Sequence, residues 1–218
     1  MRHLLQPRVL HAAAIAAALS ALACYPRLSL WLHRSAPVWY LESVIFFCCI
    51  TLWAFVFAWH QPYTHRPVFT FKLEPRPFLA ATVVALGLAA VFHLWLDPPL
   101  RSKFPDEYPP DLPSWLSSVA FSFALIQLLL VFAPCDWLMR LVKNRWLAMA
   151  LTAAFAAGVQ ALKIRSLHAP VSPLLVTVML LARFLGGFLA VALYLRGGIL
   201  LVWWWDLLLQ CRHLPDLG

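Results

Sequence analysis

Long runs of apolar residues, separated by short polar or proline-rich stretches, dominate the hydrophobicity pattern of this chain. Six runs approach the length of about twenty residues that a helix needs to cross a bilayer, and a seventh, at 199–209, has about half that length. The pattern predicts an all-α fold, a polytopic membrane helix bundle with six transmembrane helices plus a short seventh. The six longer segments are expected at about 9–24, 37–59, 78–96, from 114 into 133–140, 146–162 and 173–194.

The composition agrees with this class of protein and excludes other classes. Of the 218 residues, 63% are hydrophobic and only 12% are charged, which excludes a soluble globular domain. The net charge of +8 comes from basic residues in short loops beside apolar runs, where they act as topology signals, so no nucleic acid is expected as a partner. The five cysteines form no CxxC pair, and no ligand set has metal-like spacing. No metal site is predicted, and the sequence names no cofactor.

The stretch 133–140 closes the fourth apolar run and carries the first candidate for chemistry, Asp136 with Arg140. Residues four apart share one face of a helix, and an acid before a base is the favourable order. Charges at the edge of a hydrocarbon layer are costly, so the pair marks either a structural clamp or a site.

Two further patterns concern the fifth and sixth segments. Arg183 lies inside the sixth segment, where an unpaired guanidinium is costly, so we expect it near Asp136 or Asp206. Small residues spaced by four let helix backbones approach closely, which predicts that the two segments pack together. These residues are Ala150, Ala154 and Gly158 in the fifth segment, and Ala182, Gly186 and Ala190 in the sixth.

Two proline-rich loops are expected between the early segments. The loop 60–77 contains His60 and His65, which are five residues apart and form no helical metal pair, so both are interpreted as solvated. The stretch 97–113 is the only acidic one, and its prolines predict that it contains no regular helix. Acidic residues without excess base favour the non-cytoplasmic side for this loop.

Motifs of familiar membrane hydrolases are missing, namely HExxH, GxSxG and a Gly-Xaa-Gly-Asp pair, and so are glycine-rich phosphate loops. Residues 114–210 nevertheless resemble the CPBP family of intramembrane endopeptidases, which process CAAX proteins and bacteriocins. That family carries Glu-Glu-xxx-Arg at the end of one helix, Phe-xxx-His on the next, and a final His-xxx-Asn or His-xxx-Asp after a glycine-containing helix. Here the three positions are occupied by Cys135-Asp136-xxx-Arg140, by Phe155 with Val159 or Gln160, and by Asp206-xxx-Gln210.

The resemblance implies one bundle over 1–218, with N-terminal spans at 1–113 and a CPBP-like core at 114–218. In that family the glutamates activate water, and the histidines stabilise the oxyanion or help to hold a metal. In this chain Cys135 stands at the first glutamate, and both histidine positions lack an imidazole. The resemblance therefore implies a catalytically degenerate relative that binds or scaffolds membrane substrates. Its motif positions are Asp136, Arg140, Gln160 and Asp206.

Two alternatives stay open beside this interpretation. One is an active endopeptidase with a rearranged site, in which Asp136 is the base and Gln160 or Arg183 supports the oxyanion. The other is an unrelated structural bundle whose charges form ion pairs that orient helices. Both CPBP-like interpretations require Asp136, Gln160 and Asp206 to converge. The expected partners are membrane lipid and a membrane-bound, prenylated or peptide substrate, and the expected location is the bacterial inner (plasma) membrane, crossed several times.

Overall fold

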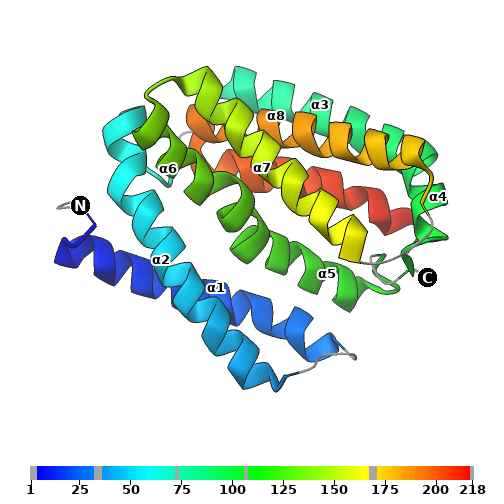
Figure 1. Cartoon of the computed structure of the whole chain (residues 1–218), viewed down its shortest axis with the longest axis horizontal. Helices are drawn as coiled ribbons and strands as arrows, with labels where there is room; N and C mark the ends of the chain where they lie inside the picture. The colour runs from blue at the N-terminus through cyan, green and yellow to red at the C-terminus, as the bar shows by residue number, and fades with distance from the viewer. Residues whose placement is uncertain (1–3, 32–35, 72–73, 106–107, 167–170, 217–218) are drawn as a thin grey trace.

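A computed structural model of the chain describes residues 4–31, 36–71, 74–105, 108–166 and 171–216 (Figure 1). The described residues form helices and connecting turns, with no strand, and six helical runs are long and apolar enough to cross a membrane. The prediction of an all-α polytopic bundle is confirmed, and the chain is a multi-pass integral membrane protein. The six runs are α1 (Pro7–Leu30), α2 (Val38–Thr64), α3 (Pro75–Val91) with η1 (Phe92–Leu96) and α4 (Asp97–Arg101), α5 (Leu112–Phe121) with η3 (Ser122–Ile126), η4 (Leu128–Phe132) and α6 (Ala133–Val142), α7 (Arg145–Ser166), and α8 (Pro173–Gln210) with η5 (Cys211–Asp216).

Proline and short polar residues define where these helices begin. Four of the long runs start with proline in the first turn, where a backbone N–H has no partner inside the helix. Asp111 caps α5 by accepting a hydrogen bond from the Ser114 backbone N–H at 2.8 Å. Hydrogen bonding to Ser114, through its side chain first and its backbone N–H second, lowers the pKa of the Asp111 carboxyl group. Ser172 caps α8 in the same way through the Leu175 N–H.

A sharp turn at Gly198 divides α8 into a first arm (173–197) and a second arm (199–210). Gly198 has φ 68° and ψ −163°, a conformation that only glycine adopts readily. In Figure 1 the first arm, in orange, runs one way and the second arm, in red, runs back beside it. The loop after α2 covers the turn, because Ile199 N–H donates to the Val68 carbonyl at 3.3 Å. The two arms are the predicted sixth span and short seventh helix.

Two predicted loop boundaries are wrong. α2 continues to Thr64, so His60 lies in a helix rather than at the start of a loop. The stretch 97–101 is helical despite its prolines, because Pro98 and Pro99 fall in the first turn of α4, where no N–H is required. Of the predicted acidic loop, Asp106 and Glu107 lie outside the described residues.

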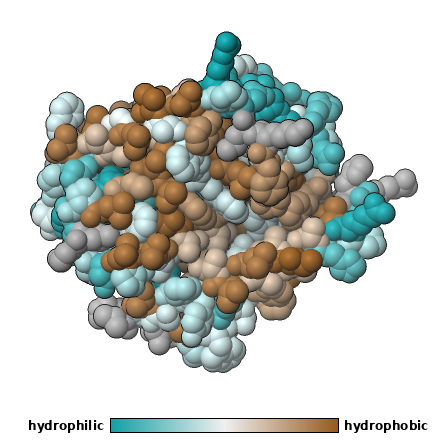
Figure 2. Space-filling view, turned by 180° about the vertical axis from the view of Figure 1, so that it is seen from behind, coloured by the Kyte–Doolittle hydropathy of each residue, from teal (hydrophilic) through white to brown (hydrophobic). Residues whose placement is uncertain are grey.

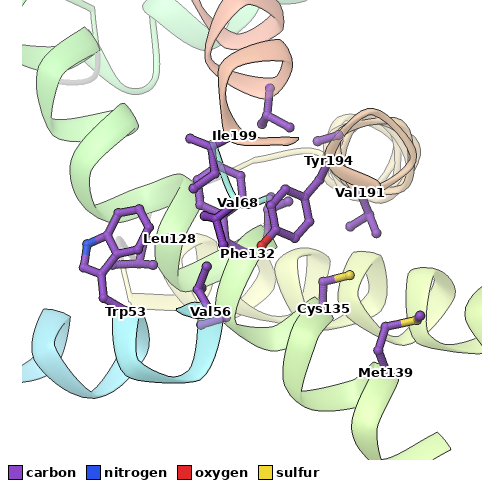
Figure 3. Close-up of a cluster of buried hydrophobic side chains, with 14 of the residues drawn as sticks. Trp53, Val56, Val68, Leu128, Phe132, Cys135, Met139, Val191, Tyr194 and Ile199 are labelled. Carbon is purple, nitrogen blue, oxygen red and sulfur yellow. The ribbon is translucent and has the colours of Figure 1, made fainter. Parts of the chain in front are cut away.

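The main core lies where α2, α6 and the turn of α8 meet (Figure 3). Val56, Leu128, Phe132 and Tyr194 are all fully buried there. The Trp53 indole N–H, at the edge of this cluster, donates to the Ser20 hydroxyl on α1 at 3.0 Å. The core therefore joins helices from both ends of the sequence.

The packing of α7 against the first arm of α8 is confirmed, but α7 uses a different face from the predicted one. A Cβ placed at Gly187 would lie 3.4 Å from the Ala153 Cα, so the two backbones approach closely at these residues. Ala154 and Gly158 are exposed instead. Successive residues turn by about 100° around a helix, so the contact face lies one residue away from the predicted stripe.

The outer surface is strongly apolar. Figure 2 shows hydrophobic residues spread across the middle of one face, with hydrophilic residues gathered mainly toward its edges. Large side chains such as Leu79, Trp95 and Leu181 are more than half exposed. Lipid tails are as apolar as these side chains, so this surface suits a bilayer.

Candidate functional site

A cavity of about 360 Å³ lies among η1, α7 and the two arms of α8. Its volume falls within the range of about 300–1,000 Å³ that is usual for small-molecule sites. Part of its wall is apolar, with Phe92, Leu96, Val131 and Met179 among the lining residues. The cavity is therefore a candidate binding site inside the membrane-spanning region.

Small residues and residues of π-helical turns line this space. Ala182, Gly186 and Ala190 line the cavity, and a Cβ added at Gly186 would meet no atom within 4 Å. On the first arm, the stripe of small residues that was predicted to contact another helix thus also lines the cavity. The opposite wall includes residues of the π-helices η1 and η4, and π-turns are frequent at functional sites.

The polar side chains that line the cavity include Gln160 on α7, Arg183 on the first arm and Asp206 on the second arm. Asp206 is only 7% exposed, and its Oδ2 accepts a hydrogen bond from the Ser122 hydroxyl at 2.6 Å. The Arg183 guanidinium interacts electrostatically with Asp206, as expected, while its buried Nε has no hydrogen-bond partner among the described residues. The fold-back of α8 at Gly198 is what brings these two charges to one cavity.

Ion pairs close one end of the cavity, where the third span meets η5. Arg212 Nε lies 3.2 Å from Asp97 Oδ2, and the Tyr108 hydroxyl donates to Asp97 Oδ1 at 3.1 Å. Burial, together with the neighbouring Asp97 carboxylate, raises the pKa of Tyr108 well above its usual value, so its hydroxyl remains a donor. Arg101 pairs with Asp216 in the same cluster. These contacts attach η5 to the end of the third span.

The structure divides the sequence-predicted site residues into two groups. Gln160 and Asp206 line the cavity together with Arg183, whereas Asp136 and Arg140 are not among its lining residues. The convergence of Asp136, Gln160 and Asp206 that both CPBP-like interpretations require is therefore not what the structure has.

Asp136 belongs instead to a sealed cluster formed by His60, Asp136 and Tyr194, which are all at most 1% exposed. Asp136 Oδ1 lies 3.3 Å from His60 Nδ1, and its Oδ2 accepts a hydrogen bond from the Tyr194 hydroxyl at 2.6 Å. The His60 and Tyr194 rings are 4.5 Å apart. One carboxylate thus joins α2, α6 and the first arm of α8.

The predicted pairing of Asp136 with Arg140 is wrong among the contacts that the structure describes. The Arg140 guanidinium lies over the Trp59 ring, 4.6 Å from its centroid, while Asp136 points into the core. A cation on an aromatic face is stabilised without a carboxylate, so Arg140 does not need Asp136. Both contacts attach α6 to α2.

Sequence reasoning missed His60 and Tyr194. The signal for His60 was its helical spacing, because Cys49, Trp53, Val56 and His60 fall on one buried face of α2. For Tyr194 no local signal exists, since its hydroxyl meets Asp136 across 58 positions of the chain.

The fold defines a multi-pass membrane protein, with a partly polar cavity among its helices. Comparisons of the chain with protein-family models, with curated proteins and with solved structures found no match. Within the described ranges, no group of three or more His, Cys, Asp or Glu side chains is placed to hold a metal ion.

Proposed function

We propose that this protein is a membrane-embedded binding protein that holds an amphiphilic molecule in the cavity between α7 and the arms of α8. The observation that carries the proposal is the convergence of Gln160, Arg183 and Asp206 on one cavity whose wall is partly apolar and partly polar. Small-molecule sites combine apolar surface with convergent polar groups that fix the orientation of the ligand. Ionisable residues within membrane spans mark functional positions by default.

Binding is better supported than peptide hydrolysis. A general base must reach the water that it activates, and Asp136 is fully buried among the side chains of the sealed cluster, away from the cavity lining. The proposal keeps the binding role expected from the CPBP resemblance, but it does not rest on that resemblance, because Asp136 does not converge with Gln160 and Asp206. In this proposal the bundle keeps the ability to accommodate a membrane molecule without the family's chemistry.

The test compares a substitution that fills the cavity with one that does not. Gly186 lines the cavity, whereas Gly158 is exposed on α7 outside the lining, and neither glycine has an atom within 4 Å of an added Cβ. Gly186→Leu and Gly158→Leu are therefore matched variants. Each is purified into lipid nanodiscs and titrated with dodecyl amphiphiles that bear different headgroups, while unfolding is followed.

We expect at least one amphiphile to raise the unfolding temperature of the wild type and of Gly158→Leu, and to have no effect on Gly186→Leu. A ligand at one hundred times its dissociation constant stabilises a folded protein by about 2.7 kcal/mol, which unfolding measurements resolve. The proposal fails if no amphiphile stabilises the wild type, or if Gly186→Leu responds as the wild type does. Release of cleaved peptide by the wild type would favour the rearranged enzyme instead.

A further inference from the structure

We infer that the ligand is an anionic amphiphile, whose carboxylate or phosphate headgroup is bound by Arg183 while its chain lies against the apolar wall. This inference rests on the proposed function and adds the chemical class of the ligand. It follows from the charges around the cavity, from the hydrogen bonds that those charges already make, and from the shape of the apolar surface.

Basic side chains outnumber acidic ones in the cavity lining, with Lys163, Arg183 and Arg212 against Asp206. Arg212 pairs with Asp97. Arg183 lies in the membrane-spanning part of α8, and its guanidinium interacts electrostatically with Asp206. A guanidinium has five N–H donors, so one carboxylate leaves donors for a second acceptor.

Arg183 has unused hydrogen-bonding capacity, and Asp206 has little. The buried Arg183 Nε lacks a hydrogen-bond partner among the described residues. Asp206 accepts from Ser122, and Gln127 also hydrogen-bonds to it, so its charge is partly satisfied within the protein. A guanidinium presents several N–H donors in a plane that matches a carboxylate or phosphate. Arg212 Nε and His213 Nδ1, also at the cavity, lack a hydrogen-bond partner among the described residues too. The unsatisfied group of Arg183 is a donor, and an anionic headgroup supplies its acceptor.

The apolar wall distinguishes an amphiphile from a small free anion. Phe92, Leu96 and Met179 line the same cavity as Arg183. An inorganic ion would leave these side chains facing water or empty space, whereas a hydrocarbon chain buries their surface. An amphiphile fits both features, because its headgroup binds Arg183 and the first part of its chain contacts these apolar side chains.

The experiment compares ligands that share a dodecyl chain and differ in headgroup. The probes are dodecanoate, dodecyl phosphate, dodecanol, dodecyltrimethylammonium and dodecylphosphocholine, with acetate and inorganic phosphate as anions that lack the chain. Dissociation constants are measured for the wild type, Arg183→Gln and Arg183→Lys in nanodiscs of neutral lipid. Arg165→Gln is the matched control, because Arg165 is an exposed cation near the end of α7 outside the cavity lining.

We expect dodecanoate or dodecyl phosphate to bind the wild type at least tenfold more tightly than dodecanol. Arg183→Gln should abolish that tenfold preference, and Arg165→Gln should retain it. Arg183→Lys keeps the charge and loses the planar donor set, so it should retain part of the preference. If Arg183→Gln does not fold, the comparison of Arg183→Lys with the wild type gives the same test at smaller amplitude.

Other outcomes separate this inference from the proposed function. If no probe binds the wild type, the proposed function fails. If dodecanol binds as tightly as dodecanoate and Arg183→Gln changes neither affinity, the cavity binds amphiphiles regardless of their headgroup charge. The inference is then overturned, while the proposed function stands. Tighter binding of dodecyltrimethylammonium or dodecylphosphocholine overturns it in favour of a headgroup cation at Asp206. Equal binding of acetate or phosphate removes the role of the chain.

Discussion

The two buried carboxylates of this protein have opposite surroundings. Asp136 has both oxygens engaged, by His60 and by Tyr194, inside a core with no described opening. Asp206 also accepts a strong hydrogen bond, but it lies beside a cavity and across from Arg183. Burial and charge alone would rank the two aspartates equally. The difference is that the Asp136 carboxylate has both oxygens engaged away from any cavity lining, whereas Asp206 adjoins a cavity that also holds the Nε of Arg183, which is unpaired among the described residues.

This difference supports a structural role for the sealed cluster and the proposed binding role for the cavity beside Asp206. A carboxylate whose two oxygens are both hydrogen-bonded inside a core fixes the relative positions of helices. A polar group beside unfilled volume leaves interactions for a ligand. The residues around Asp136 come from three helices, which is what a clamp requires, and those around Asp206 frame an internal space.

Loss of the Asp136 carboxylate should have the largest effect on stability. Asp136→Ala leaves the buried His60 ring and Tyr194 hydroxyl without their shared acceptor, and breaking a buried polar pair in this way costs about 3–5 kcal/mol. Unfolding of the purified variant in detergent measures the loss. Asp206→Ala, beside the cavity, should cost clearly less, and an equal or larger loss there would remove the distinction between the clusters.

The turn at Gly198 lies between the two clusters, so its substitution should disturb both. An added Cβ would lie 2.8 Å from the Val68 carbonyl oxygen, in a backbone conformation that side chains rarely adopt. We expect Gly198→Ala to reduce stability by about 2–3 kcal/mol and to weaken ligand binding as well. Gly87→Ala, at an exposed helical position with open space, should be neutral or stabilising. Equal behaviour of the two variants would contradict the proposed turn.

Removal of the Tyr194 hydroxyl tests how much the sealed cluster depends on the pairing of both Asp136 oxygens. Tyr194→Phe keeps the ring against Phe132 and His60 but leaves Asp136 Oδ2 without its donor, at a cost of about 1–2 kcal/mol. The free energy of unfolding should fall accordingly, and the affinity for an amphiphile should not change. A loss of affinity without a loss of stability would place Tyr194 in the binding site.

The smallest effect on stability should come from Asp111, whose carboxylate is exposed to solvent. Asp111 is exposed, and its cap on Ser114 lowers the pKa of its carboxyl group in the folded state. Its contribution is therefore present above the unfolded pKa of about 4 and is lost as pH falls through the lower, folded value. Asp111→Ala should remove that acid-dependent contribution, and Asp111→Asn should keep the cap without the titration. Unfolding scans from neutral to acidic pH detect the difference.

Segment length and hydrophobicity were sufficient to predict the spans and the short last helix. Crossing a bilayer requires a fixed length of apolar chain, so this information is local. Glycines at 197 and 198 mark the point where the sixth segment ends, and the turn occurs there. The cost of an unpaired charge predicted that Arg183 lies near Asp136 or Asp206, and the structure has it interacting with Asp206.

The sealed cluster was not predictable for a different reason. His60 precedes a glutamine and a proline, so the sequence suggested a loop, although its spacing from Val56 continues the buried face of α2. Asp136 has Arg140 as a neighbour on its own helix, but it is bonded to groups on two others. A local sequence pattern shows which side-chain pairs are possible, but the rotation of each helix about its own axis decides which pairs form. The rotation of α7 likewise places its contact face one residue away from the predicted stripe.

Thiol accessibility at the two clusters tests this account most directly. The native Cys135, next to Asp136, is fully buried, and Gln160→Cys places a second thiol on the cavity wall. The variant in nanodiscs is treated with a small methanethiosulfonate reagent, and labelling of each cysteine is followed by peptide mass spectrometry. The account predicts that the thiol introduced on the cavity wall reacts, that the best-binding dodecyl amphiphile slows this reaction, and that Cys135 stays unlabelled until the protein unfolds. Rapid labelling of Cys135, or an introduced thiol that is unreactive or indifferent to every amphiphile, would contradict the separation into a sealed cluster and a binding cavity.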